Sequence, residues 1–182
     1  ADHGVSAKNI GDEGGFAPQL DTPEQALSII EQAIQKAGYK VGEDITLALD
    51  CAASEFYDRE TGKYELVEGK WFTSSEAVDF YVEMVDAHPA LVSIEDPLDE
   101  KDYDGWAKFT AALGERIMVV GDDLYTTNTN LISRGIQGKW ANSLLLKVNQ
   151  IGTVSEGMEA AQMLFGASVQ PATGRWRHGP SP

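Results

Sequence analysis

Leu91-Val92-Ser93-Ile94-Glu95-Asp96-Pro97 is a short, mainly apolar run that ends in two carboxylates and a proline. Such a run predicts a strand buried within a sheet, and the proline ends it. Parallel strands buried on both faces are apolar throughout, so the first charged side chain after the run lies where the strand leaves the core. We therefore expect the Glu95 carboxylate at the carboxyl end of a buried strand.

Three further apolar runs end in charged residues. They are Ile45–Leu49 before Asp50, Ile117–Gly121 before Asp122 and Asp123, and Ser143–Leu146 before Lys147.

The charged ends of these runs lie 25 to 45 residues apart along the chain. A strand with its helix and two loops needs about 25 to 30 residues, so the two shorter intervals fit single βα units. The longest interval carries an insertion, in which a small hairpin is expected around Arg59–Thr61. Amphipathic helices are predicted between the strands, for example over Tyr103–Leu113. This alternation predicts an α/β fold with a parallel sheet, and a barrel of such units gathers its carboxyl ends on one face.

The composition limits the functions that the chain can have. It has 182 residues, 42% of them hydrophobic, which suits one globular unit with a buried core. Its 14 basic and 29 acidic residues give a net charge of −15, which argues against nucleic acid and anionic membranes as partners. The single cysteine suits a reducing compartment, and no apolar run or signal-peptide pattern indicates a membrane or secretory route. We expect a cytoplasmic location.

Residues 167–182, ASVQPATGRWRHGPSP, break the alternation of strands and helices. They contain three prolines and no Asp or Glu. Because proline is excluded from central strands, we expect no strand here and a disordered tail. The predicted organisation is a barrel segment over residues 1–166 and an atypical tail over residues 167–182.

Three of the strand-end carboxylates, Asp50, Glu95 and Asp122, form a set of oxygen ligands without cysteine or histidine. Hard oxygen ligands of this kind favour Mg²⁺, which shares its coordination sphere with water and substrate oxygens. The alternative is that each carboxylate only stabilises the amino end of the following helix.

Lys147 and Glu13 are the candidate proton-transfer groups. A lysine at the end of an apolar strand, beside a cation, is expected to have a lowered pKa and to act as a general base. The alternative for Lys147 is an ion pair with one of the neighbouring acids. Glu13 lies between glycines in Gly11–Gly15, a loop that can approach a ligand closely, and is the candidate acid. The alternative for this loop is an ordinary acidic turn.

These residues stand in five longer motifs that resemble enolase, the phosphopyruvate hydratase of glycolysis. The resemblance extends from about residue 5 to residue 166, and it implies a partial (β/α)8 TIM-like barrel of the enolase C-terminal domain, incomplete at both ends. The motifs are NIGDEGGFAP at 9–18, LDCAASEF at 49–56, SIEDP at 93–97, VGDDL at 120–124 and LLLKVNQIG at 144–152.

The resemblance implies a lyase that reversibly dehydrates 2-phosphoglycerate to phosphoenolpyruvate with Mg²⁺. Enzymes of this superfamily pair a lysine base with the metal. Asp123 matches a position that steers the ligands. By motif position, Glu13 matches the proton donor, Lys147 the proton acceptor, and Asp50, Glu95 and Asp122 the metal ligands.

The sequence also departs from the enolase pattern. Family members, commonly homodimers, carry an N-terminal α+β domain and, after the position of Gly166, a serine-histidine-arginine-serine motif that binds phosphate. Neither is found in these 182 residues, and His178 does not lie in that motif. We therefore expect weak Mg²⁺ binding and negligible turnover by this chain alone. The alternatives are an acid-sugar dehydratase or racemase of the same superfamily, and a non-catalytic enolase fragment that acts as a binding protein or antigen.

Overall fold

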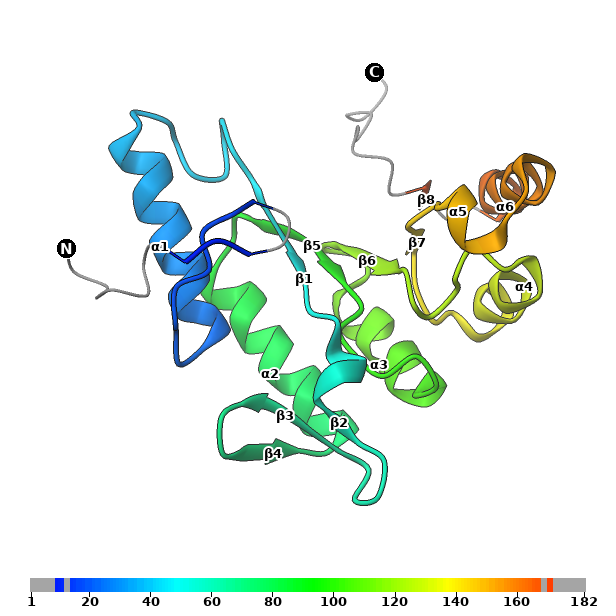
Figure 1. Cartoon of the computed structure of the whole chain (residues 1–182), viewed down its shortest axis with the longest axis horizontal. Helices are drawn as coiled ribbons and strands as arrows, with labels where there is room; N and C mark the ends of the chain where they lie inside the picture. The colour runs from blue at the N-terminus through cyan, green and yellow to red at the C-terminus, as the bar shows by residue number, and fades with distance from the viewer. Residues whose placement is uncertain (1–8, 12–13, 168–169, 172–182) are drawn as a thin grey trace.

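The main sheet consists of five parallel strands (Figure 1). The computed structural model describes residues 9–11, 14–167 and 170–171. The order of strands across the sheet is β1-β5-β6-β7-β8, so each strand pairs with the next one along the chain that joins this sheet. This confirms the predicted α/β fold with a parallel sheet. The strands are β1 (Leu47–Asp50), β5 (Leu91–Glu95), β6 (Met118–Gly121), β7 (Ser143–Leu144) and β8 (Gln170–Pro171).

The register of the sheet brings the carboxyl ends of the strands together. Asp50 of β1 is paired with Glu95 of β5, and Glu95 is paired with Val120 of β6. Gly121 in turn is paired with Leu144 of β7. The charged residues that end or follow these strands therefore start from the same edge of the sheet. β1 is the outermost strand, and it is buried on one face only, unlike the fully buried strand that its sequence predicts.

Helices alternate with the strands and lie along one side of the main sheet, where α2 packs against α3 and α4 against α6 (Figure 1). Polar residues stabilise the first turns: Thr73 and Glu76 form a capping box at the start of α2. α3 has the predicted bounds. The helices are α1 (Pro23–Lys36), α2 (Ser74–Ala87), α3 (Tyr103–Leu113), α4 (Thr129–Gly138), α5 (Val148–Ile151) and α6 (Val154–Gly166).

The insertion between β1 and α2 forms a small antiparallel sheet of β2 (Tyr57–Asp58), β3 (Lys63–Val67) and β4 (Lys70–Phe72). The predicted hairpin around Arg59–Thr61 is confirmed, and β4 adds a third strand. Tyr64 of β3 is fully buried and joins this sheet to the chain after β5. Its hydroxyl donates to Asp102 Oδ2 at 2.8 Å and accepts from the backbone N–H of Asp99 at 3.0 Å.

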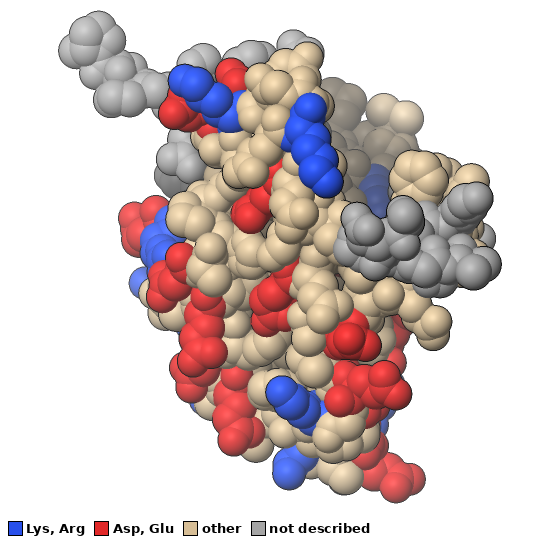
Figure 2. Space-filling model, turned by 90° about the vertical axis from the view of Figure 1, so that its left-hand side faces the viewer, with Lys and Arg blue, Asp and Glu red and all other residues tan. Residues whose placement is uncertain are grey.

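The core lies between the main sheet and the helices. Trp106, Phe109 and Leu113 of α3 are completely buried, and the Phe109 ring meets the edge of Tyr81 from α2. Burying a large apolar side chain of this kind contributes about 1.5–3 kcal/mol, so α3 is a main source of stability. On the outside, acidic side chains cover more of the face in Figure 2 than basic ones do, as the net charge of −15 requires. No helix in the described part of the chain is long and apolar enough to cross a membrane.

The sequence predicts no strand after Gly166. This prediction is wrong at two residues. Gln170 and Pro171 form β8 and pair in parallel with Ser143 and Leu144 of β7. β8 is the last strand in the order of the sheet. Proline is tolerated in edge strands better than in central ones, because an edge strand pairs on fewer sides. Residues 168–169 and 172–182, including His178, lie outside the described residues.

Candidate metal centre

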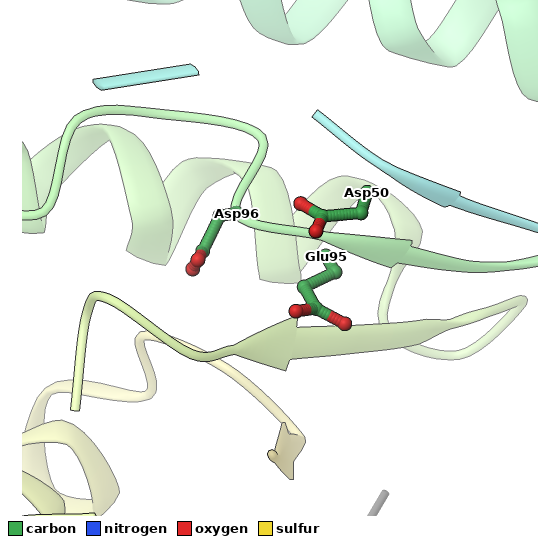
Figure 3. A group of neighbouring side chains, drawn as sticks. All are labelled: Asp50, Glu95 and Asp96. Carbon is green, nitrogen blue, oxygen red and sulfur yellow. The ribbon is translucent and has the colours of Figure 1, made fainter. Parts of the chain in front are cut away.

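The carboxyl ends of β1 and β5 bring three acidic side chains together (Figure 3). One carboxylate oxygen from each of Asp50, Glu95 and Asp96 lies within 4.8 Å of the others. Asp50 is exposed and accepts a hydrogen bond from the Ala52 N–H at 3.1 Å. Glu95 is half-buried and Asp96 is buried. In Figure 3 the carboxylates of Asp50 and Glu95 lie beside each other, whereas that of Asp96 points toward the chain that follows β6.

A second acidic group adjoins the first and shares Asp96 with it. It consists of Asp96, Asp122 and Asp123, again with oxygens within 4.8 Å of one another. The Asp122 carboxylate is already hydrogen-bonded on both sides. Lys147 Nζ donates to its Oδ2 at 2.5 Å, and Gln150 Nε2 donates to its Oδ1 at 2.8 Å. Of the three predicted ligands, Asp50 and Glu95 thus share one group, and Asp122 lies in the neighbouring group.

Two side chains of this region, Asp96 and Gln150, were not among the sequence-predicted site residues. In a strand, successive side chains point to opposite faces, so the residue after Glu95 was not expected to face the same cluster. Asp96 has a φ of 42°, a left-handed turn that redirects its side chain toward β6. Gln150 lies three residues after Lys147, and this helical spacing was the available signal for it.

The carboxylates raise one another's pKa values. Burial raises the pKa of Glu95 to about 7, and the nearby carboxylates of Asp50, Asp96 and Asp122 add to the effect, while Lys147 opposes it. Burial also raises the pKa of Asp96 to about 6, against two backbone hydrogen bonds that lower it. Burial and the neighbouring Asp122 raise the pKa of Asp123 as well. The cluster is therefore short of positive charge, which is the electrostatic setting that favours binding of a cation.

Lys147 does not have the lowered pKa that we predicted for it. Its hydrogen bond to Asp122 raises the pKa of the ammonium group, and the charges of Asp122, Glu95 and Asp50 act in the same direction. Burial, which lowers the pKa, is the weaker effect because 40% of the side chain is exposed. The alternative that the sequence left open, an ion pair with one of the acids, is the arrangement found.

Thr127 holds Lys147 beside Asp122. Its hydroxyl accepts a hydrogen bond from the Lys147 backbone N–H at 2.9 Å and lies 3.4 Å from Gln150 Oε1. Thr127 is fully buried, so its position is fixed by the surrounding packing. Lys147 and Gln150, the two donors to Asp122, are therefore placed by one threonine.

Glu13, the predicted proton donor, lies outside the described residues. A hollow of about 500 Å³ opens between β4 and α2, where Trp71 and Phe80 line it. The strand-end carboxylates do not line that hollow. The candidate centre is thus defined by its converging acids and their lysine.

The parallel strands alternate with helices, which defines a partial (β/α)8 barrel. The acidic residues and the lysine at the carboxyl ends of its strands define a candidate metal centre. Residues 1–175 match the family described as enolase, C-terminal TIM barrel domain. The chain belongs to this family, whose members are lyase-type enzymes that bind small-molecule substrates. The resemblance to enolase is thereby confirmed, and the match continues past Gly166 into the segment that we expected to be atypical.

Proposed function

We propose that the chain provides the metal centre and the proton acceptor for the enolase reaction, the reversible dehydration of 2-phosphoglycerate to phosphoenolpyruvate in glycolysis. The observation that supports this most directly is the convergence of Asp50 and Glu95 at the ends of two strands, with Asp122 in the adjoining acidic group, in a chain of the enolase family. On this proposal the protein acts in the cytoplasm, and a homodimer is the state expected of full-length family members.

The donor set suits Mg²⁺. The candidate ligands are all carboxylate oxygens, the type that this ion prefers. Glu95 has its pKa raised to about 7 by burial and by its acidic neighbours, and a dication would offset that repulsion. Asp50, Glu95 and Asp122 would hold the ion. To do so, Asp122 would give up its ion pair with Lys147. Bound Mg²⁺ would supply the positive charge that stabilises the substrate carboxylate as negative charge develops on it.

Lys147 would take the proton from C2 of 2-phosphoglycerate. The C2–H electron pair becomes the C2–C3 double bond, and the C3 hydroxyl leaves as water with a proton from Glu13. A protonated lysine cannot accept a proton, and the ion pair with Asp122 favours the protonated form. Recruitment of Asp122 to the cation would remove that effect. Metal binding would thus release Lys147 to act as the base.

The same geometry supports the expectation of little turnover by the 182-residue chain alone. Of the ion pairs found among residues 9–11, 14–167 and 170–171, the pair of Lys147 with Asp122 is the one that involves a proposed ligand. A substrate phosphate beside this acidic cluster would need further cations. We therefore propose that binding and slow proton exchange, rather than rapid dehydration, are the activities to be measured in this chain.

Mg²⁺ binding tests the metal centre. Calorimetric titration at pH 8 is expected to give weak binding by the wild-type chain and at least about tenfold weaker binding by Asp50→Asn. Asp79→Asn is the matched control, because Asp79 is an exposed acid on α2, away from the strand ends. Equal affinities for wild type and Asp50→Asn, or no binding by either, would remove the proposed site.

Proton exchange tests the chemistry. With Mg²⁺ in deuterated buffer, the wild-type chain is expected to exchange the C2 proton of 2-phosphoglycerate slowly, and Lys147→Ala is expected not to. Exchange on an acid sugar instead would support the other superfamily reaction. Metal-independent partner binding without any exchange would support the alternative of a non-catalytic binding protein or antigen.

A further inference from the structure

We propose that Asp96 is a positioning residue, which holds the turn carrying Asp122 in place beside the proposed ligands, and that it does not itself bind the cation. This inference rests on the proposed metal centre. It concerns how that centre is kept in shape.

Both carboxylate oxygens of Asp96 accept backbone hydrogen bonds from the turn after β6. The N–H of Asp122 donates to Oδ1 at 3.0 Å, and the N–H of Asp123 donates to Oδ2 at 2.9 Å. Hydrogen bonds to a charged acceptor are stronger than those between neutral groups. The Asp96 carboxylate thus fixes the two backbone positions from which the side chains of Asp122 and Asp123 start.

The backbone of Asp96 is tied to the strands on both sides of β5. Its N–H donates to the carbonyl oxygen of Val120 in β6 at 3.0 Å, and its own carbonyl oxygen accepts the N–H of Ala53, after β1, at 3.0 Å. Its φ of 42° is unfavourable for a residue with a side chain, and such a conformation persists where surrounding contacts impose it. Asp96 therefore links the ends of three strands, β1, β5 and β6.

The direction of the side chain separates this role from that of a ligand. Figure 3 shows the Asp96 carboxylate turned away from the paired carboxylates of Asp50 and Glu95. Its closest polar partners are the two N–H groups of the turn. Asp96 is also only 4% exposed, whereas Asp50 is exposed. Asp96 belongs to both acidic groups because it lies between them.

The first test needs no metal. In ¹H–¹⁵N spectra of the full 182-residue chain without Mg²⁺, the amides of Asp122 and Asp123 are expected to show downfield proton shifts and protection from hydrogen exchange. Asp96→Asn keeps the side-chain size but only one acceptor oxygen, so at least one of the two amides is expected to exchange about tenfold faster. Asp50→Asn is the control and should leave both amides unchanged. Unprotected amides in the wild-type chain would overturn the proposal.

The second test compares the signs of two effects at pH 8. Asp96→Asn is expected to lower the melting temperature without Mg²⁺ and to weaken Mg²⁺ binding by ~10–100-fold, as loss of a ligand-supporting contact does. Asp50→Asn should weaken Mg²⁺ binding but leave the metal-free melting temperature equal or higher, because it removes like-charge repulsion. If Asp96→Asn instead raises the metal-free melting temperature while weakening binding, Asp96 is a ligand and the proposal is wrong. If the wild-type chain binds no Mg²⁺, the proposed function fails, while the amide data still decide the role of Asp96.

Discussion

Lys147 Nζ lies 2.5 Å from Oδ2 of Asp122, so the proposed proton acceptor and a proposed metal ligand are bonded to each other. On the proposed function these groups would have to separate, since Asp122 would face the cation and Lys147 would face the substrate. Metal binding and the protonation of Lys147 would thereby be coupled.

Lys147→Met is expected to bind Mg²⁺ roughly three- to tenfold more tightly than the wild-type chain. It removes a positive charge that competes with the cation for Asp122, while it keeps the apolar stem of the side chain. Calorimetry at pH 8 and low salt measures the change. Lys101→Met is the control, because 64% of the Lys101 side chain is exposed and it pairs with Glu100 outside the proposed ligand set. Unchanged or weaker binding by Lys147→Met would contradict the coupling.

Without metal, the chain is expected to become less stable as the pH rises from about 4.5 to about 7. Folding raises the pKa of Glu95 from an ordinary value of 4.5 to about 7, so the folded state holds this proton more tightly than the unfolded state does. The folded state therefore loses stability progressively as Glu95 ionises across this range. Urea unfolding across this range measures the slope. The Glu95→Gln variant should show a smaller slope of unfolding free energy against pH. An identical slope in both proteins would show that ionisation of Glu95 does not cause it.

Mg²⁺ binding is expected to release more protons at pH 6.5 than at pH 8. The pKa values of Glu95, about 7, and Asp96, about 6, leave part of each carboxyl protonated at the lower pH. Because a cation favours the ionised forms, its binding expels those protons. Calorimetry in two buffers of different ionisation enthalpy counts them. Proton release that does not depend on pH would show that these groups do not sense the cation.

Tyr64→Phe is expected to lower the free energy of unfolding by about 1–3 kcal/mol. The change removes the hydroxyl that donates to Asp102 and accepts from the Asp99 N–H, and it leaves a buried donor without its partner. Urea unfolding provides the measurement. The control is Tyr39→Phe, at a residue that is 55% exposed. If the free energy of unfolding falls equally little in both variants, this hydroxyl does not hold the small sheet in place.

Gly135→Ala and Gly166→Ala are expected to differ in their effect on stability. A Cβ at Gly135 in α4 would overlap the ring of Tyr125, which is buried, so the substitution should cost about 1–3 kcal/mol. A Cβ at Gly166, at the end of α6, meets nothing within 4 Å and should be neutral or stabilising by up to about 1 kcal/mol. Thermal unfolding distinguishes the two, and equal losses would contradict the packing described for α4.

The apolar runs of the sequence were sufficient to predict the main sheet. Leu91–Glu95 became β5, and the runs before Asp50, Asp122 and Lys147 became β1, β6 and β7 in parallel order. The start of α2 is equally local in origin, because Thr73 bonds a free N–H group of its first turn whatever the rest of the fold. The exposed face of β1 and the pairing of β8 were not predicted, because both depend on a strand's place in the sheet.

The candidate site was predicted less completely than the fold. The convergence of Asp50 and Glu95 followed from the rule that parallel strands end at the same edge. The bond between Lys147 and Asp122 was one of two possibilities, because the pKa of a lysine depends on which carboxylate it meets. The part played by Asp96 could not be foreseen, since strand alternation directs neighbouring side chains to opposite faces.

By itself, the sequence determined the kind of fold and the edge at which its charged groups collect. Strand burial and helix capping depend on residues that are close together in the sequence. Only the tertiary structure decided which of those groups contact one another. The left-handed turn at Asp96 and the hydroxyl of Thr127 direct side chains over a few ångströms, and residues from separate strands and loops set those directions together.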